Sequence, residues 1–469
     1  MSGKKFTVIF ILFFVTIPLD DLISQERDNT PVIVLTLDQC IEMTLKNNLS
    51  RTASSLGVKA AEAQVKQARS GGFPKVDLNA AYLLMDQNPN FIFPEMSVEI
   101  PPINMGTFSI SPGAFSIPNQ NIKLADNQTV TASLEFLFPL YTGGKISSYI
   151  SQAEAALEIA KSDSRGNDQQ IIFETKKLFY ATLLTIKLEE IANEAYERLN
   201  STLKLTESTY LNGSGKVTKS DYLKNKTVTE AVKSIWIQIE GENKNALAAL
   251  AHAMGLDWKT RVRIAETEFP HVVQTADLES LITTAIERNP LFSKVGYGLK
   301  AFESKIDLAK SELYPSVALF GSYKKLFNSY DYGMTTPDNK NLWMVGVGVQ
   351  LNIFDGFKTS GMIDQAKANY DQLNTQKEML TKGISLKVQY LYNKLETAKL
   401  KEAASREAMQ AAVDDRDLVE KAYFSDIMEL KDLIQAQITE SLMKAQYETA
   451  KYEWTLLQSE LDLVLATER

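Results

Sequence analysis

Few side chains in this sequence are of the kinds that catalyse reactions or bind metals. The 469 residues include two histidines, His252 and His271, and one cysteine, Cys40. No carboxylate or cysteine is arranged around either histidine, and a single cysteine excludes an intrachain disulfide and a cysteine-clustered metal site. Residues 213–216, Gly-Ser-Gly-Lys, lack the spacing and the preceding strand of a phosphate-binding loop. We therefore predict a protein that is not an enzyme and that needs no cofactor or metal ion.

The N-terminal residues have the pattern of a secretory signal peptide. Two lysines precede an apolar run from Phe6 to Ile17, and the sequence then turns polar. We predict a signal peptide over residues 1–25, so the mature protein leaves the cytoplasm. Beyond this run no window of about 18 apolar residues occurs, which argues against a helical membrane span. A formal charge of −8 without a basic run argues against nucleic acid as a partner.

Cys40 ends a Leu-Asp-Gln-Cys sequence that loosely resembles a lipoprotein acylation box. The apolar run ends well before this point, and Asp38 and Gln39 stand where small residues are expected. We interpret Cys40 as a half-buried residue of the first helix.

In the second half of the chain the spacing of apolar residues changes from that of a strand to that of a helix. From Leu342 to Ile353, apolar residues alternate with glycine, amide or other residues, which predicts a strand with one apolar face. A tilted strand of about ten residues can cross a bilayer. From residue 357 to about 423 the apolar spacing becomes helical and no proline occurs, so one helix could run roughly 100 Å.

The chain contains an internal repeat. The sequence from Leu37 aligns without a gap to the sequence from Leu278, which places Asn48 on Asn289. Each copy ends its helical part at a proline that starts an extended segment, namely Pro74 and Pro315. We predict two structural repeats. The first covers residues 26–265, with helices at 37–72, strands at about 76–85 and 129–140 and a helical hairpin at 144–255. The second covers residues 266–469, with helices at 278–313, strands at about 316–324 and 342–354 and a helical hairpin at 357–467.

Each strand pair leads into a long helix through a similar junction, Leu-Tyr-Thr-Gly-Gly-Lys in the first repeat and Ile-Phe-Asp-Gly-Phe-Lys in the second. An aromatic residue at a strand end suits a membrane interface, threonine or aspartate can cap a helix, and glycine permits a tight turn. The residues expected to form these junctions are Pro139, Tyr141, Gly143, Gly144, Phe354, Asp355 and Gly356. Between the first two strands, residues 86–128 contain six prolines, which excludes a helix or a central strand and predicts an extended loop. Residues 256–275 have the character of a linker between the repeats.

Four strands per chain cannot close a barrel, and an open edge in lipid would leave backbone groups unpaired. Other chains must therefore complete the wall. An eight-stranded barrel is filled by its own side chains, so a conducting channel favours three or more chains over two.

The sequence resembles the TolC-like outer-membrane efflux family. The resemblance rests on the two proline sites, the two junctions, the tandem repeat and the turns of the helical hairpins, and it covers about Leu37 to Leu465. It implies a mainly α protein with transmembrane β-strands, which forms a homotrimer with one twelve-stranded β-barrel in outer-membrane lipid. The long helices would extend the barrel as a tunnel through the periplasm of a Gram-negative type envelope.

The resemblance also implies a function. Family members are exit ducts of tripartite efflux or type I secretion systems, and they passively export small molecules, metal ions or polypeptides. The implied partners are a periplasmic adaptor (membrane fusion) protein and an inner-membrane transporter of the RND, ABC or MFS type. The sequence does not identify the cargo, since the transporter selects it.

Similarity to the family's turn motif assigns a periplasmic constriction to Tyr423, Asp432 and Asp221. Met428, in the same turn, is a further candidate for this constriction. In a trimer, Asp432 would form a ring of three carboxylates that attracts cations. The alternative is that both aspartates are ordinary carboxylates at helix starts, favoured there by the helix dipole.

The turns also depart from the family pattern. The second turn has Asp426 where glycine is common, Met428 where arginine is common, and Gln435 at the second acidic position. An arginine-based lock is therefore in doubt, and Met428 could contact an adaptor. The residues expected to dock the adaptor are Gly213, Gly215 and Asp426. A structural or adhesive coiled-coil protein of the envelope is the alternative function, although four alternating strands argue against it.

Overall fold

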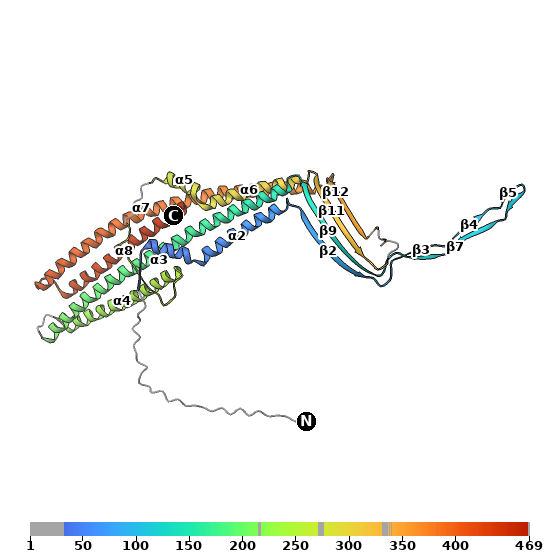
Figure 1. The fold of residues 1–469 in the computed structure, drawn as a ribbon. Coiled ribbons are helices and arrows are strands. Elements are labelled where there is room, and N and C mark those ends of the chain that lie inside the picture. Colours follow the sequence, from blue (N-terminus) through green and yellow to red (C-terminus); the bar gives the residue numbers. More distant parts are fainter. Residues whose placement is uncertain are drawn as a thin grey trace, which may run out of the picture. The chain divides into compact units, whose positions relative to one another are not determined.

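The computed structural model describes residues 32–213, 217–270, 276–330, 336, 338 and 340–467 (Figure 1). The predicted signal peptide, Gly215 and His271 lie outside the described residues. The helices are α1 (Leu37–Asn47), α2 (Leu49–Ser70), α3 (Lys145–Leu211), α4 (Lys219–Ala253), α5 (Leu278–Arg288), α6 (Pro290–Ser311), α7 (Lys358–Phe424) and α8 (Leu430–Leu465). The strands are β1 (Val32–Leu35), β2 (Lys75–Leu84), β3 (Asn90–Phe93), β4 (Met96–Ile100), β5 (Ile103–Met105), β6 (Phe108–Ile110), β7 (Gly113–Ile117), β8 (Gln120–Lys123), β9 (Gln128–Tyr141), β10 (Arg261–Ile264), β11 (Ser316–Phe327) and β12 (Asn341–Gln350).

The chain divides into two compact units that do not coincide with the two sequence repeats. The first unit comprises residues 1–47, 174–271 and 400–456, and the second comprises residues 48–173, 272–399 and 457–469. Each unit takes residues from both repeats. The repeats are therefore copies in the sequence, and neither copy is a compact body of its own.

The second unit contains a four-stranded antiparallel sheet in the order β12-β11-β9-β2 (Figure 1). Its register brings the alternating apolar residues of all four strands onto one face. Leu78, for example, lies opposite Leu134, which lies opposite Tyr323, which lies opposite Trp343. The other face carries Asp77, opposite Glu135, and mostly small or polar residues. The predicted alternation thus gives a sheet with one apolar and one polar face.

The apolar face is exposed in the single chain. Side chains on the edge strands β2 and β12 are strongly exposed, for example Leu78 at 75% and Trp343 at 77%. On the opposite face the Phe320 ring covers Gly346, where an added Cβ would come within 2.8 Å of the ring. Glycine at this position therefore lets an aromatic ring from β11 pack flat on β12.

Strand β12 is shorter than predicted. We expected a strand over 342–354, but β12 ends at Gln350. Gln350 pairs with Ser316, the first residue of β11, and the preceding Pro315 has no N–H to donate. Residues 351–354 therefore have no strand among the described residues with which to extend the ladder.

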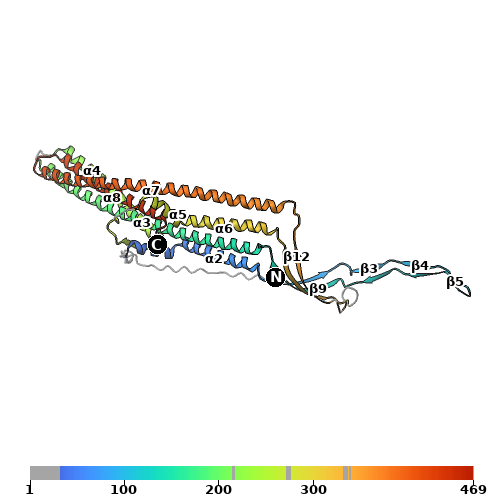
Figure 2. The same cartoon turned by 90° about the horizontal axis from the view of Figure 1, so that it is seen from above.

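The proline-rich segment between β2 and β9 is a long two-stranded ribbon and not a loop without regular structure. We call residues 90–123 the ribbon. It consists of three antiparallel ladders, β3 with β8, β4 with β7 and β5 with β6. Figure 2 shows the ribbon extending from the end of the sheet. The prolines fall between the ladders, where no backbone donor is needed, which is why they permit strands that we did not predict.

The helix breaks and strand starts follow the repeat. Asn48 caps α2 by accepting hydrogen bonds from Ser50 N–H and Arg51 N–H, and the aligned Asn289 caps α6 by accepting from Leu291 N–H. Pro74 and Pro315 each stand one residue before a strand, β2 and β11. At aligned positions, both copies thus use asparagine to cap a helix and proline to precede a strand.

The first junction combines a bulge with two glycines in the left-handed region. The register between β9 and β11 shifts where Val317 pairs with Tyr141 and Ala318 with Pro139, and a proline is tolerated at such a bulge. Gly143 and Gly144 have φ of +61° and +91°. These conformations are readily available only to glycine.

The second junction turns with different residues. Gly356 has φ of +68° and Phe357 has φ of +67°. The Asp355 carboxylate accepts a hydrogen bond from Thr359 N–H at 2.8 Å, so it caps the start of α7 as the sequence indicated. The Phe354 ring is 74% exposed and lies edge-on to the Phe357 ring.

The first unit has a small parallel sheet that the sequence did not predict. Strand β10 lies in residues 256–275, which we interpreted as a linker, and it pairs with β1. Cys40 is completely buried in the core beneath this sheet, not half-buried as predicted. Burial, with a contribution from Glu266, raises the pKa of the Cys40 thiol to about 12.

None of the described helices has a stretch that is both long enough and apolar enough to cross a membrane.

Replacing Gly143 with alanine should destabilise the junction more than replacing Gly144. A Cβ at Gly143 would meet Tyr314 Cβ at 2.7 Å and Ser311 O at 2.8 Å, whereas at Gly144 its nearest neighbour would be 3.8 Å away. Gly144→Ala thus introduces backbone strain alone and should lower the free energy of unfolding by about 1 kcal/mol. Gly143→Ala adds a steric clash and should lower it by about 2 kcal/mol or more. Denaturant unfolding of the detergent-purified variants measures both costs, and equal costs would contradict this account.

Candidate functional site at the turns of the helical hairpins

The predicted constriction residues lie at helix ends beside two turns, both in the first unit. The first turn joins α3 to α4, and the second joins α7 to α8. Both hairpins are visible in Figure 1 as pairs of long helices.

The two turns close their first helix in the same way. Gly213 N–H donates to Tyr210 O at 3.2 Å, and Asp426 N–H donates to Tyr423 O at 3.1 Å. Both residues are in the left-handed region, with φ of +67° and +59°. In the second turn Ile427 N–H also donates to the carbonyl five residues back, which completes a Schellman motif. Asp426 therefore adopts the same left-handed conformation as Gly213.

Asp221 caps the start of α4. Its carboxylate accepts hydrogen bonds from the Thr218 hydroxyl at 2.6 Å and from Thr218 N–H at 3.1 Å, and Asp221 N–H donates to the Thr218 hydroxyl. This reciprocal arrangement is a capping box. The Thr218 hydroxyl is the main cause that lowers the pKa of Asp221 below its ordinary value.

Asp432 has the equivalent place in the first turn of α8. Its carboxylate accepts a hydrogen bond from Glu429 N–H at 3.2 Å. Both predicted constriction aspartates therefore satisfy backbone donors at a helix start, as the alternative interpretation expected. Capping uses only part of the lone pairs of a carboxylate, so the role of Asp432 in a carboxylate ring stays a prediction.

Apolar side chains surround the second turn. Tyr423 packs against Val419, Leu433 and Ala436. Beyond it, Phe424 is 66% exposed, Ile427 is 76% exposed and Met428 is also exposed. The turn thus presents an apolar rim, defined as Phe424, Ile427 and Met428, while Tyr423 ties it to α8.

Behind the second turn lies a cluster of charges that sequence analysis missed. The Glu440 side chain is 2% exposed, and its carboxylate lies 2.9 Å from Arg416, 2.8 Å from Lys444 and 3.8 Å from Arg198. Glu194 joins the cluster through Arg198 and Lys444. We call these five residues the ion cluster. It links α3, α7 and α8, because each helix contributes at least one member.

Attraction between the opposite charges of the ion cluster offsets the cost of burying them. Burial of Glu194 opposes its ionisation, but hydrogen bonds from Arg198 and Lys444 outweigh this and hold the pKa of its carboxyl below the ordinary value.

Arg198 and Glu420 line a pocket of about 310 Å³ beside the cluster. The spacing of Glu440 and Lys444, and of Glu194 and Arg198, was visible in the sequence as possible helical ion pairs.

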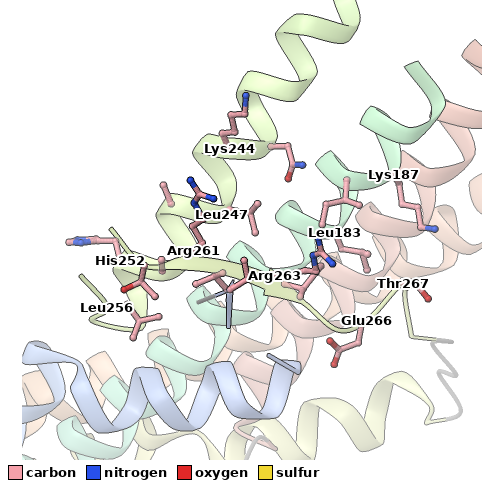
Figure 3. A pocket seen from close by; sticks show the side chains of 18 of the residues that line it. Leu183, Lys187, Lys244, Leu247, His252, Leu256, Arg261, Arg263, Glu266 and Thr267 are labelled. Carbon is pink, nitrogen blue, oxygen red and sulfur yellow. The ribbon is translucent and has the colours of Figure 1, made fainter. Parts of the chain in front are cut away.

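A second pocket in the first unit lies beside β10, and Figure 3 shows its side chains. Lys187 and Lys244, on α3 and α4, stand on its walls with Leu183 and Leu247. The ammonium of Lys187 is 3.2 Å from Glu268, and that of Lys244 is 2.7 Å from Glu240, so acidic side chains offset these charges. His252 lies on the wall, and the described residues contain no group of three or more His, Cys, Asp or Glu placed to hold a metal ion.

A model of outer membrane efflux proteins matches residues 40–256 and 281–467, one segment in each repeat. The chain belongs to the outer membrane efflux protein family. The two matched segments also confirm the internal repeat.

Individual relatives are distant in sequence but alike in fold. The outer membrane efflux protein BepC of Brucella suis is 19% identical over 372 residues, which cover 74% of this chain and 75% of BepC. A membrane protein from Pseudomonas aeruginosa has a TM-score of 0.73 at 17% identity, over 93% of this chain and 92% of that one. The CmeC outer membrane channel of Campylobacter jejuni has a TM-score of 0.69 at 15% identity, over 92% and 85%. This efflux protein therefore has the TolC-like fold expected from its sequence.

Replacing Glu440 with glutamine should destabilise this efflux protein by about 3 kcal/mol, because Arg416 would lose a buried partner. The matched control is Glu453→Gln, which removes the carboxylate of an exposed pair with Lys401 and should cost at most about 1 kcal/mol. Denaturant unfolding in detergent measures both. A cost for Glu440→Gln no larger than the control would show that the ion cluster does not hold the three helices.

Proposed function

We propose that this efflux protein is the outer-membrane exit channel of a tripartite efflux or type I secretion system. The family match over both repeats carries this proposal. BepC is an efflux protein and CmeC is a channel, and both are of the outer membrane. The protein would let cargo pass from the periplasm through the outer membrane without performing chemistry on it.

The sheet supports assembly into a trimer. Strands β2 and β12 each have one unpaired edge within the described chain, and the apolar face of the sheet is exposed. In lipid, unpaired backbone groups cost several kcal/mol each, so the β2 edge of one copy would pair with the β12 edge of the next. Three copies would give a closed wall of twelve strands, which leaves a lumen that eight strands would not. The apolar face would then contact lipid and the polar face would line the lumen.

The hairpin turns would form the periplasmic end of the channel. The apolar rim with Met428, together with Gly213 and Asp426, is the surface we assign to the periplasmic adaptor; Gly215, also expected there, lies outside the described residues. An exposed apolar patch at such a place fits contact with a protein partner. The adaptor would connect the channel to an inner-membrane transporter of the RND, ABC or MFS type.

The constriction would be formed by Asp432, Asp221 and Tyr423. Three symmetric copies of Asp432 would give a ring of carboxylates, which favours cations over anions. Asp432 caps its helix through one hydrogen bond to Glu429 N–H, so its charge remains available to ions. The Tyr423 contacts with α8 would hold the narrow part in place.

Channel formation can be tested with the purified full chain. We expect a band of trimer mass on an unheated detergent gel that collapses to monomer on boiling, and ion conductance in planar bilayers. A monomer that conducts no ions would reject the proposed function.

Asp432→Asn should lower the preference for cations. In a salt gradient across the bilayer, the reversal potential should move toward the value for a non-selective pore, because three carboxylates are removed from the constriction. Glu429→Gln is the matched control, since Glu429 is an exposed acidic residue of the same turn. An unchanged reversal potential for Asp432→Asn, or an equal change in both variants, would reject the filter role.

A further inference from the structure

The ribbon, residues 90–123, carries an apolar surface for which the function proposed above has no use. Most of its apolar side chains are exposed, including Met105 at 71% and Phe108 at 67%. An isolated two-stranded ribbon is marginally stable in water, because one face has nothing to pack against. Some other surface must cover these side chains.

Two of the three ladders, β4 with β7 and β5 with β6, each have one apolar and one polar face. Between β4 and β7, Val98 pairs with Phe115 on one face, while Ser97 pairs with Ser116 on the other. Between β5 and β6, Met105 pairs with Phe108, while Asn104 pairs with Ser109. This strict alternation is the pattern of a ribbon that is covered on one face and exposed to water on the other.

The charges of the ribbon exclude one class of partner. Within residues 90–123 the acidic side chains are Glu95 and Glu99, and the one basic side chain, Lys123, forms an ion pair with Asp126. Such a segment is repelled by anionic surfaces such as nucleic acid or acidic lipid headgroups. The partner must therefore offer an apolar surface rather than negative charge.

The connection to the sheet brings copies of the ribbon together. Met85 N–H donates to Asn127 O at 2.8 Å, and Leu124 N–H donates to Pro89 O at 2.7 Å. These bonds join the ribbon to β2 and β9 without a flexible linker. If three sheets form one wall, three ribbons leave the same rim, at a high effective concentration for one another.

We propose that the ribbons of neighbouring copies pack against one another through their apolar faces and form a stalk beyond the channel wall. This rests on the proposed function, because only a trimer places the ribbons on one rim. The polar faces, with Glu99, point outward, so the acidic groups of different copies stay in water.

Cysteine cross-linking in the membrane-embedded trimer tests this contact. Val98→Cys and Phe108→Cys place thiols on the apolar faces, and Ser97→Cys and Ser109→Cys are matched controls one residue away on the polar faces. The native Cys40 is completely buried, so the unsubstituted protein gives the background. After reaction with a short bis-maleimide and boiling, we expect dimer and trimer bands from the first pair, at least about fivefold stronger than from the controls.

The remaining outcomes separate the two proposals. Three outcomes would overturn the ribbon contact while leaving the proposed channel intact. They are a trimer on the unheated gel without cross-links, equal cross-linking in the two pairs of variants, and adducts only to a different protein. Absence of a trimer on the unheated gel would overturn the proposed function and this inference with it.

A charge substitution gives a second readout that needs no thiol. Val98→Asp would bring like charges together between the apolar faces, so the trimer band should dissociate at a lower temperature than that of the unsubstituted protein. Ser97→Asp, on the polar face, should leave this temperature unchanged. Equal dissociation temperatures for the two variants would contradict the contact.

Discussion

The unpaired backbone edges of the four-stranded sheet are the constraint on which the rest of this structure depends. Strands β2 and β12 each present donors and acceptors that no other described strand of the chain satisfies. The register also collects the apolar side chains on one face, so the sheet has a side for lipid and a side for water. A chain with these two properties is incomplete by itself. In the proposed trimer the copies supply the missing strands, which is how the sheet of each chain becomes part of a channel wall.

Much of this sheet could be predicted because its information is local. A period of two over Leu342–Val349 fixes which side chains share a face, and Pro74 and Pro315 fix where strands can start. The glycines of the first junction could be predicted for the same reason, since a tight turn requires φ values that Gly143 and Gly144 adopt. The family resemblance then supplied what local patterns lack, namely the expectation of three copies around one twelve-stranded barrel.

The features that sequence analysis missed depend on distant or weak signals. Strands β1 and β10 have four residues each and pair across more than 200 positions, so neither gives a periodic pattern long enough to recognise. The ribbon was hidden by its prolines, which forbid a central strand but permit short ladders between them. The burial of Glu440 results from three helices meeting, whereas its spacing to Lys444 alone is typical of an ion pair on a helix surface. The candidate aspartates were placed correctly at helix starts, yet no local signal could show what faces them in an assembly.

Each hairpin turn needs a residue in the left-handed conformation at the end of its first helix, and the two turns use different residues there. Gly213 adopts the left-handed conformation without strain, whereas Asp426 adopts it at a cost of about 1 kcal/mol. The Schellman hydrogen bonds and the packing of Tyr423 against Leu433 offset that cost locally. Strain of this kind persists where surrounding structure fixes it, and it is concentrated at functional sites. The strained turn also carries the apolar rim and has the ion cluster behind it, which supports its proposed part in the constriction.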